Sequence, residues 1–173
     1  MKVRSKDWWE RIVLQEFTDY DWKENFRMTR QTFVKLCGLV EDFMAPEDFT
    51  VRAPIPLMMR VAMVVYRMGT SGEYRIVANQ FGVHKCTVMK FTVMFCEGMV
   101  KGPIKDLIHM PNEEEATEIA RRFEAAYGVP QIMRIIDGTH IPILPPIDGY
   151  KDFVNRKGWA SYVLQAVVDD ACW

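Results

Sequence analysis

The segment QIMRIIDGTHIPI, residues 131–143, decides the expected fold of the second half of this chain. It is rich in isoleucine, and a second segment of the same kind, SYVLQAVVD at residues 161–169, follows a polar loop that contains prolines. Short runs rich in Ile, Val, Thr and Tyr, bounded by turn residues, are typical of strands. We therefore expect two strands here, with a carboxylate, Asp137, in the middle of the first.

Asp137 is the unusual residue of this segment. On a strand it shares a face with Ile135, Thr139 and Ile141. A carboxylate buried among aliphatic side chains is costly unless it is paired or binds a metal. Three interpretations stay open: a metal or catalytic ligand, an aspartate satisfied by backbone amides at a bulge near Gly138, and an Asp-Gly hairpin turn. The apolar pattern continues unbroken past this dipeptide, which argues against the turn.

Other polar residues near the two segments are weaker candidates. His140 lies near the expected end of the first strand, and Asp169 and Asp170 end the second. A lone histidine in such a place is more often structural, and two acids after a strand commonly form a turn. The residues alone assign no role to His140 or Asp169.

The first half of the chain carries helix signals. Phe33, Leu36, Cys37 and Val40 form an apolar stripe at helical spacing. Thr29 precedes that stripe and is a residue type favoured as an N-cap. These signals predict a helix that begins just after Thr29.

Further helices are expected on both sides of a proline-rich stretch. Residues 41–56 contain three prolines and predict a loop, and a helix should follow at 57–68. Another helix should begin after Asn112, with glutamates in its first turn, and end at Gly128. We expect a domain boundary near residues 105–111.

Residues 74–91, YRIVANQFGVHKCTVMKF, match the pattern of a helix-turn-helix unit. Ala78 is the small residue where the helices cross, and Gly82 is the turn residue that adopts an unusual backbone conformation. Five apolar residues should face inward: Val77, Phe81, Val83, Val88 and Phe91. Five residues should face outward on the second helix: His84, Lys85, Thr87, Met89 and Lys90.

Such a helix could enter a major groove, with Lys85 and Lys90 near phosphates and Thr87 near base edges. The alternative is a helical hairpin that only packs. The 173-residue chain has a formal net charge of −1, which argues against strong binding to nucleic acid through bulk charge. Any binding to DNA by this unit is therefore expected to be weak and steeply dependent on salt.

The composition predicts a folded, soluble and intracellular protein. The chain is 49% apolar and 26% charged, and no apolar run is long enough to span a bilayer. The cysteines show no metal-binding spacing and are expected to be reduced thiols: Cys37, Cys86, Cys96 and Cys172.

Several motifs together resemble one protein family. RIIDGTHIPILPP at 134–146 and DFVNRKGWASYVLQAVVD at 152–169 resemble the start of the catalytic domain of PIF/Harbinger-type transposases. They equally resemble the nucleases domesticated from these transposases. The upstream segments FRMTRQTFVKLCGLV and YRIVANQFGVHKCTVMKF stand in the order that this family shows. The resemblance covers roughly residues 25–173.

The resemblance implies an α+β fold. An all-α domain at residues 1–110, with a helix-turn-helix-like unit at about 57–100, would precede the first strands of an incomplete ribonuclease-H-like DDE endonuclease domain at 111–173. Its acids would hold two divalent cations, Mg²⁺ or Mn²⁺, which clamp the attacking and leaving oxygens of a phosphodiester. By motif position Asp137 is the first acid, both a catalytic residue and a metal ligand, and the aliphatic residues around it are expected to bury a central strand.

The remaining acids of the family come later in the chain. Asp169 would end the second strand at its turn into a third, away from Asp137. A chain that ends at Trp173 is expected to be a fragment, an incomplete gene model or a decayed copy, and to be inactive as a nuclease by itself. Two strands alone are also marginal in water.

The resemblance also implies partners and a location. DNA would be the substrate, and Arg156 and Lys157, in the NRKGW turn, could contact phosphate or simply form a solvated loop. The alternative function is a non-catalytic DNA- or protein-binding module that acts with a Myb-like DNA-binding protein. The family implies the nucleus, with the cytoplasm also open, and no membrane. The oligomeric state, the target sequence and the choice of metal cannot be read from the sequence.

Overall fold

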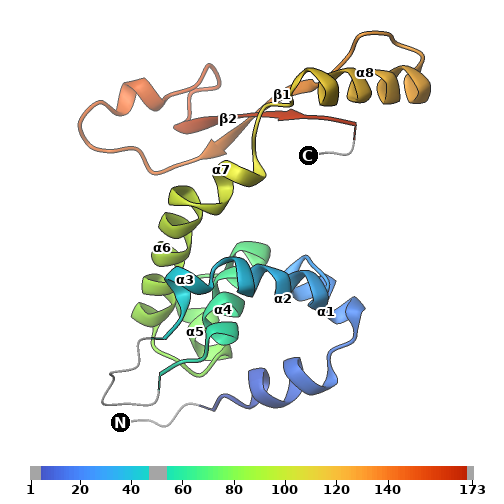
Figure 1. Cartoon of the computed structure of the whole chain (residues 1–173). Coiled ribbons are helices and arrows are strands. Elements are labelled where there is room, and N and C mark those ends of the chain that lie inside the picture. Colours follow the sequence, from blue (N-terminus) through green and yellow to red (C-terminus); the bar gives the residue numbers. More distant parts are fainter. Residues whose placement is uncertain (1–4, 47–53, 171–173) are drawn as a thin grey trace. The chain divides into compact units, whose positions relative to one another are not determined.

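The computed structural model describes residues 5–46 and 54–170. The chain divides into two compact units, Met1–Leu107 and Ile108–Trp173 (Figure 1). Cys172 lies outside the described residues, as do residues 47–53 of the expected loop. Among the described helices, none combines the length and the apolar character needed to cross a membrane.

The first unit is helical throughout its described part. Its elements are the π-helix η1 (Trp8–Glu16) and the α-helices α1 (Asp19–Phe26), α2 (Arg30–Leu39), α3 (Glu41–Met44), α4 (Leu57–Thr70), α5 (Tyr74–Gln80), α6 (Lys85–Lys101) and α7 (Pro103–Leu107). The predicted helices at 57–68 and after Thr29 are confirmed. The Thr29 hydroxyl accepts the Thr32 N–H, so the predicted N-cap is confirmed as well.

The helix α4 is the centre of this unit. Its residues from Met59 to Val65 are all buried, so other elements cover it on every side over this span. Aromatic side chains fill the adjoining core, where the ring of Trp22 lies 4.7 Å from that of Phe26 and 5.1 Å from that of Phe33, measured between centroids. Burying each such side chain contributes about 1.5–3 kcal/mol.

The prediction that residues 41–56 form a loop is wrong at its beginning. Residues Glu41–Met44 form the short helix α3. Two acids open its first turn, which suits the positive end of a helix. Met44 is fully buried, so the core holds this helical turn in place although the prolines that follow argue for a loop.

The second unit consists of the helix α8 (Glu113–Tyr127), the strands β1 (Ile135–Pro142) and β2 (Ser161–Val168), and the 3-10 helix η2 (Tyr150–Phe153) between them. Asn112 and Glu115 cap α8 reciprocally, and Gly128 ends it at φ +71°. The helix and both strands are therefore confirmed. The overall class is α+β, helix-rich with a small sheet.

The strands pair antiparallel in one register. Ile135 lies opposite Val168 and Pro142 opposite Ser161. Every residue of β1 is exposed, so the expectation of a buried central strand is wrong for this chain. The physical reason is that the described part of the sheet holds only these two strands, and neither of its faces is covered over β1.

Candidate functional site

Asp137 lies in the interior of β1, opposite Ala166 of β2. Its Oδ1 accepts the N–H of Gly138 at 2.7 Å. Opposed residues of an antiparallel pair project to the same face, so Thr139 and Leu164 are on the face of Asp137. The turn interpretation of this dipeptide, which the apolar pattern already argued against, is excluded, because β1 continues through Gly138 in unbroken register with Gln165.

Asp137 is surrounded by apolar residues but is not buried among them. Ile135 is 51% exposed and Ile141 is 46% exposed, and both share its face. The carboxylate therefore keeps water as a partner in this chain, and no desolvation cost has to be offset. The expectation that burial forces Asp137 to bind a metal is not met by this chain alone.

Asp169 does not approach Asp137. Ala166, the partner of Asp137, precedes Asp169 by three residues, and at about 3.3 Å per residue that separation is about 10 Å along the strand. Among the described residues, no group of three or more His, Cys, Asp or Glu side chains could hold a metal ion together. Asp137 is therefore a single candidate ligand in this part of the chain.

Asp170 has a structural role that its position in the sequence did not reveal. Its carboxylate accepts two hydrogen bonds from Arg122 of α8, at 2.6 Å from Nε and 2.9 Å from Nη2. This hydrogen-bonded guanidinium holds the pKa of the Asp170 carboxyl below its usual value. The bond fastens the end of β2 to α8.

His140 is also part of a structural network. Its Nδ1 lies 2.9 Å from the Ser161 hydroxyl, which in turn accepts the Nδ2–H of Asn155 at 3.0 Å. Ser161 is buried, and the His140 ring packs edge-on against that of Trp159. These contacts join the start of β2 to β1 and to the preceding turn, which favours the structural interpretation of His140.

Arg156 and Lys157 lie in a turn that Asn155 shapes. The Asn155 side-chain oxygen accepts the N–H of Lys157 at 2.9 Å and that of Trp159 at 3.4 Å. Gly158 closes the turn at φ +83°, a conformation that favours glycine. Both basic side chains are exposed. Contact of these two side chains with phosphate stays a prediction.

Residues 74–91 contain two helices that are joined by a turn. α5 and α6 are joined at Gly82, whose φ is +66°, and Ala78 is buried. All five residues expected to face inward are buried: Val77, Phe81, Val83, Val88 and Phe91. The second helix, α6, continues beyond this segment to Lys101.

The outward face of α6 is only partly suited to DNA. Lys85 and Lys90 are exposed, and Thr87 is half-buried. His84 is the N-cap of α6, where its Nδ1 accepts the Cys86 N–H at 3.3 Å. His84 is exposed, as expected of an outward position, and Met89 makes the same face partly apolar.

Arg60 is a buried polar residue whose structural role no pattern in the sequence indicated. It lies on the buried helix α4 and donates to three carbonyl oxygens, those of Ile55, Met44 and Ala45, at 2.8–3.1 Å. Its guanidinium also lies over the Phe91 ring. Arg60 thus connects α4 to α3 and to Phe91 of α6, and its role is to stabilise the fold.

The comparisons with known proteins identify the family. No family model and no solved structure matches the chain. It is 33% identical to the protein ALP1-like of Arabidopsis thaliana over 183 residues, which cover 96% of this chain and 43% of the relative. It is 29% identical to Antagonist of Like Heterochromatin Protein 1 of Arabidopsis thaliana over 181 residues, covering 94% of this chain and 44% of the relative.

Both similarities extend over nearly the whole chain, helical unit and strands together, so they define a transposase-derived class of protein. The chain belongs to the Harbinger transposase-derived family. It spans less than half the length of these two relatives.

Proposed function

We propose that this chain is the N-terminal part of a metal-dependent DNA endonuclease of Harbinger transposase ancestry, with Asp137 as its first metal ligand. The observation that carries the proposal is the position of Asp137. It is an acid in the interior of β1, a strand rich in isoleucine, and its carboxylate forms no ion pair within the described residues.

The donor chemistry fits the implied metal. A carboxylate is the hard oxygen ligand that Mg²⁺ and Mn²⁺ prefer. When bound, a pair of such ions activates water and stabilises the charge of the phosphodiester transition state. Asp137 would supply one ligand, and the other acids would come from parts of the longer protein. The 173-residue chain alone is proposed to be inactive.

The experiment is a plasmid-cleavage assay in Mg²⁺ and in Mn²⁺ on the complete gene product and on residues 1–173. The complete product is expected to nick DNA only with metal, and Asp137→Ala should abolish nicking. Asp152→Ala, an exposed acid in η2, is the matched control and should retain it. Cleavage that persists in Asp137→Ala would refute the assignment, and cleavage by residues 1–173 would refute the inactivity of the short chain.

We also propose, as a second function, a non-catalytic DNA- or protein-binding module that works in the nucleus with a Myb-like DNA-binding protein. The α5–turn–α6 geometry supports it, with Lys85 and Lys90 exposed on the second helix. The name of one relative, an antagonist of a heterochromatin protein, supports a role at chromatin.

A gel-shift series at rising salt tests the DNA-binding form of this proposal. Duplex DNA should be retained at low ionic strength and released as salt rises, because the binding would rest on electrostatic contacts between lysines and phosphates, which release counterions. Replacing Lys85 and Lys90 together by glutamine should abolish retention. Replacing Arg156 and Lys157 instead tests the NRKGW turn. No retention even at low salt would exclude DNA binding by this chain.

A further inference from the structure

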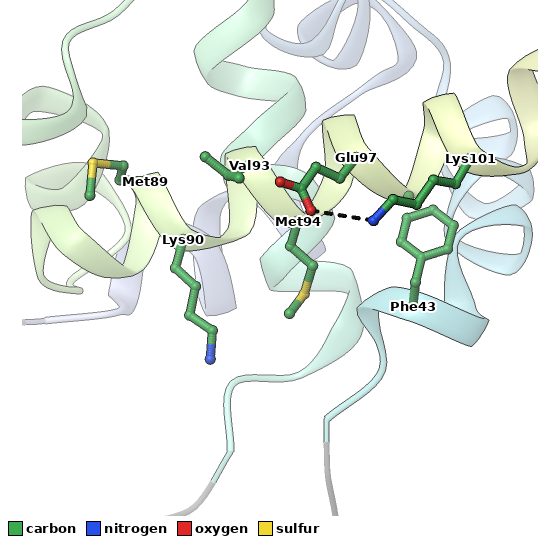
Figure 2. A pocket seen from close by; sticks show the side chains of 8 residues that line it. Phe43, Met89, Lys90, Val93, Met94, Glu97 and Lys101 are labelled. Carbon is green, nitrogen blue, oxygen red and sulfur yellow. Dashed lines mark ion pairs between the residues drawn. The ribbon is translucent and has the colours of Figure 1, made fainter.

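The first unit has an apolar groove between α6 and α3. It encloses about 530 Å³ and is lined along α6 by Met89, Val93 and Met94, with Phe43 of α3 at one end (Figure 2). Met89 is 48% exposed and Val93 is 49% exposed, so the apolar lining faces solvent. Apolar side chains that line a groove on a folded helical unit mark a place where another molecule can bind.

The groove has the dimensions of a helix-binding site. Its lining on α6 runs from Met89 to Lys101, and at about 1.5 Å per residue this is roughly 18 Å, or about three turns of a partner helix. At one end Gly98 lets the Phe43 ring pack directly on α6, since a Cβ built there would overlap that ring. Methionine side chains are flexible and adapt to different apolar partners, which is typical of helix-binding grooves.

The charged residues at the edge of the groove determine which kind of partner helix would bind. Figure 2 shows Lys90 and Lys101 beside the apolar lining, with Glu97 paired to Lys101. The Nζ of Lys101 lies 3.7 Å from the Glu97 carboxylate, and both side chains are largely exposed. The lining therefore carries two cations and one anion, a net positive rim. Carboxylates on an approaching helix would be attracted to it.

We propose that this groove binds an amphipathic helix of a partner protein, one with an apolar stripe and acidic residues beside the stripe. The apolar stripe would cover Met89, Val93 and Phe43, and a carboxylate would meet Lys90. DNA is a poorer occupant because the lining is mainly apolar and offers phosphates only two lysines. The inference deepens the proposal of a binding module by naming a site and a partner chemistry.

The test uses a fluorescein-labelled helical peptide about 14 residues long, with leucines at i, i+3, i+4 and i+7 and glutamates beside them. Fluorescence anisotropy with the full chain should show saturable binding in the micromolar range. A peptide with lysines in place of the glutamates should bind at least about tenfold more weakly, the factor that corresponds to one well-placed charge interaction.

Two variants test whether the peptide binds in the groove or through non-specific apolar contacts. Val93→Asp should weaken binding of the glutamate peptide about tenfold. Val34→Asp is the matched control, because Val34 is an equally exposed valine on α2 away from the groove, and it should change binding less than about twofold. Lys90→Glu should reverse the preference and favour the lysine peptide.

Three results would overturn the proposal: no saturable binding, equal binding of both peptides, or equal effects of Val93→Asp and Val34→Asp. A stronger effect of Val93→Asp on retention of duplex DNA than on the peptide would also overturn it, since the groove would then be a nucleic-acid surface. Failure of the duplex gel shift alone leaves the peptide result intact, so the two proposals fail separately.

Discussion

Arg122 on α8 and Asp170 after β2 form a two-point ion pair across 48 residues of sequence. Within the part of the chain that the structure describes, Arg121, the neighbouring residue, pairs with Glu118 on its own helix. The Asp170 side chain is 16% exposed, against 46–73% for the Arg121–Glu118 pair. The better shielded pair therefore fastens the helix to the hairpin, while its neighbour contributes little beyond the helix itself.

This pair gives the second unit a pH-dependent contact. Arg122 lowers the pKa of Asp170 below 3.8, its ordinary value. A carboxyl with a lowered pKa in the folded state stabilises that state above the ordinary pKa, and this stabilisation is lost as the pH falls through the folded value. Hydrogen exchange of β2 should therefore accelerate below about pH 4, on top of the intrinsic pH dependence.

Arg122→Gln should remove that acid-dependent change and lower the protection of β2 already at neutral pH. Arg121→Gln is the control, and it should leave β2 protection unchanged because Arg121 does not reach the hairpin. Equal protection in the two variants would show that the ion pair does not hold the hairpin against α8.

Gly98 and Phe43 should be energetically coupled. Replacing a helical glycine by alanine gains about 1 kcal/mol in helix propensity, but a Cβ on Gly98 would displace the Phe43 ring. Overpacking of this kind costs about 1–3 kcal/mol. Urea unfolding should show Gly98→Ala to be neutral or destabilising, and stabilising once Phe43 is also alanine.

Gly38 provides the matched control on α2. Nothing lies within 4 Å of a Cβ built there, so Gly38→Ala should stabilise the unit by up to about 1 kcal/mol. If Gly98→Ala were equally stabilising in the presence of Phe43, the packing of Phe43 against α6 would be disproved.

Local features of this fold could be predicted because local chemistry determines them. Thr29 and Asn112 carry oxygen acceptors that a helix start requires, and Gly82 adopts a backbone conformation that few other residues tolerate. The strands followed from their β-branched composition. α3 escaped prediction because burial of Met44, a tertiary effect, outweighs the proline-rich composition around it.

The candidate site was less predictable, since its features depend on distant partners. Asp137 was expected to be buried, but burial is decided by whatever packs on β1 rather than by the residues of β1. Asp170 and Arg60 form hydrogen bonds with residues 48 and 16 positions away in the sequence, and no spacing pattern predicts such pairs. The position of Asp137 on a strand could be predicted from the sequence, whereas the burial of its side chain could not.

Arg60 should be essential to the helical unit. Its guanidinium donates hydrogen bonds to three carbonyl oxygens. Two of them belong to Met44, the last residue of α3, and to Ala45, which follows it. Arg60→Met keeps the apolar stem but leaves these oxygens without their donor, at a cost of about 1–3 kcal/mol. The urea midpoint should fall accordingly. Arg67→Met, on the same helix, should cost less, because Arg67 is half-buried and its guanidinium stacks on the ring of Tyr74, which is also half-buried.

The cysteines should differ in reactivity. Burial raises the pKa of the Cys37 thiol to about 11, so little thiolate forms near pH 8. Cys86 and Cys96 are exposed on α6. Iodoacetamide at pH 8, followed by peptide mass analysis, should modify both of these and leave Cys37 unmodified until urea unfolds the unit. Equal modification of Cys37 in the folded protein would contradict its burial.

Asn155 should hold the NRKGW turn through both ends of its side chain. Asn155→Ala removes the acceptor of the Lys157 and Trp159 N–H groups and the donor to Ser161. Each hydrogen bond lost from a partly buried group costs about 0.5–1.5 kcal/mol, so amide exchange in the turn and at the start of β2 should speed up by about tenfold or more. Asn155→Asp keeps the acceptor, so it should preserve protection of the turn amides and lose only the bond to Ser161. If both variants exchanged alike, the side-chain oxygen would not be what shapes the turn.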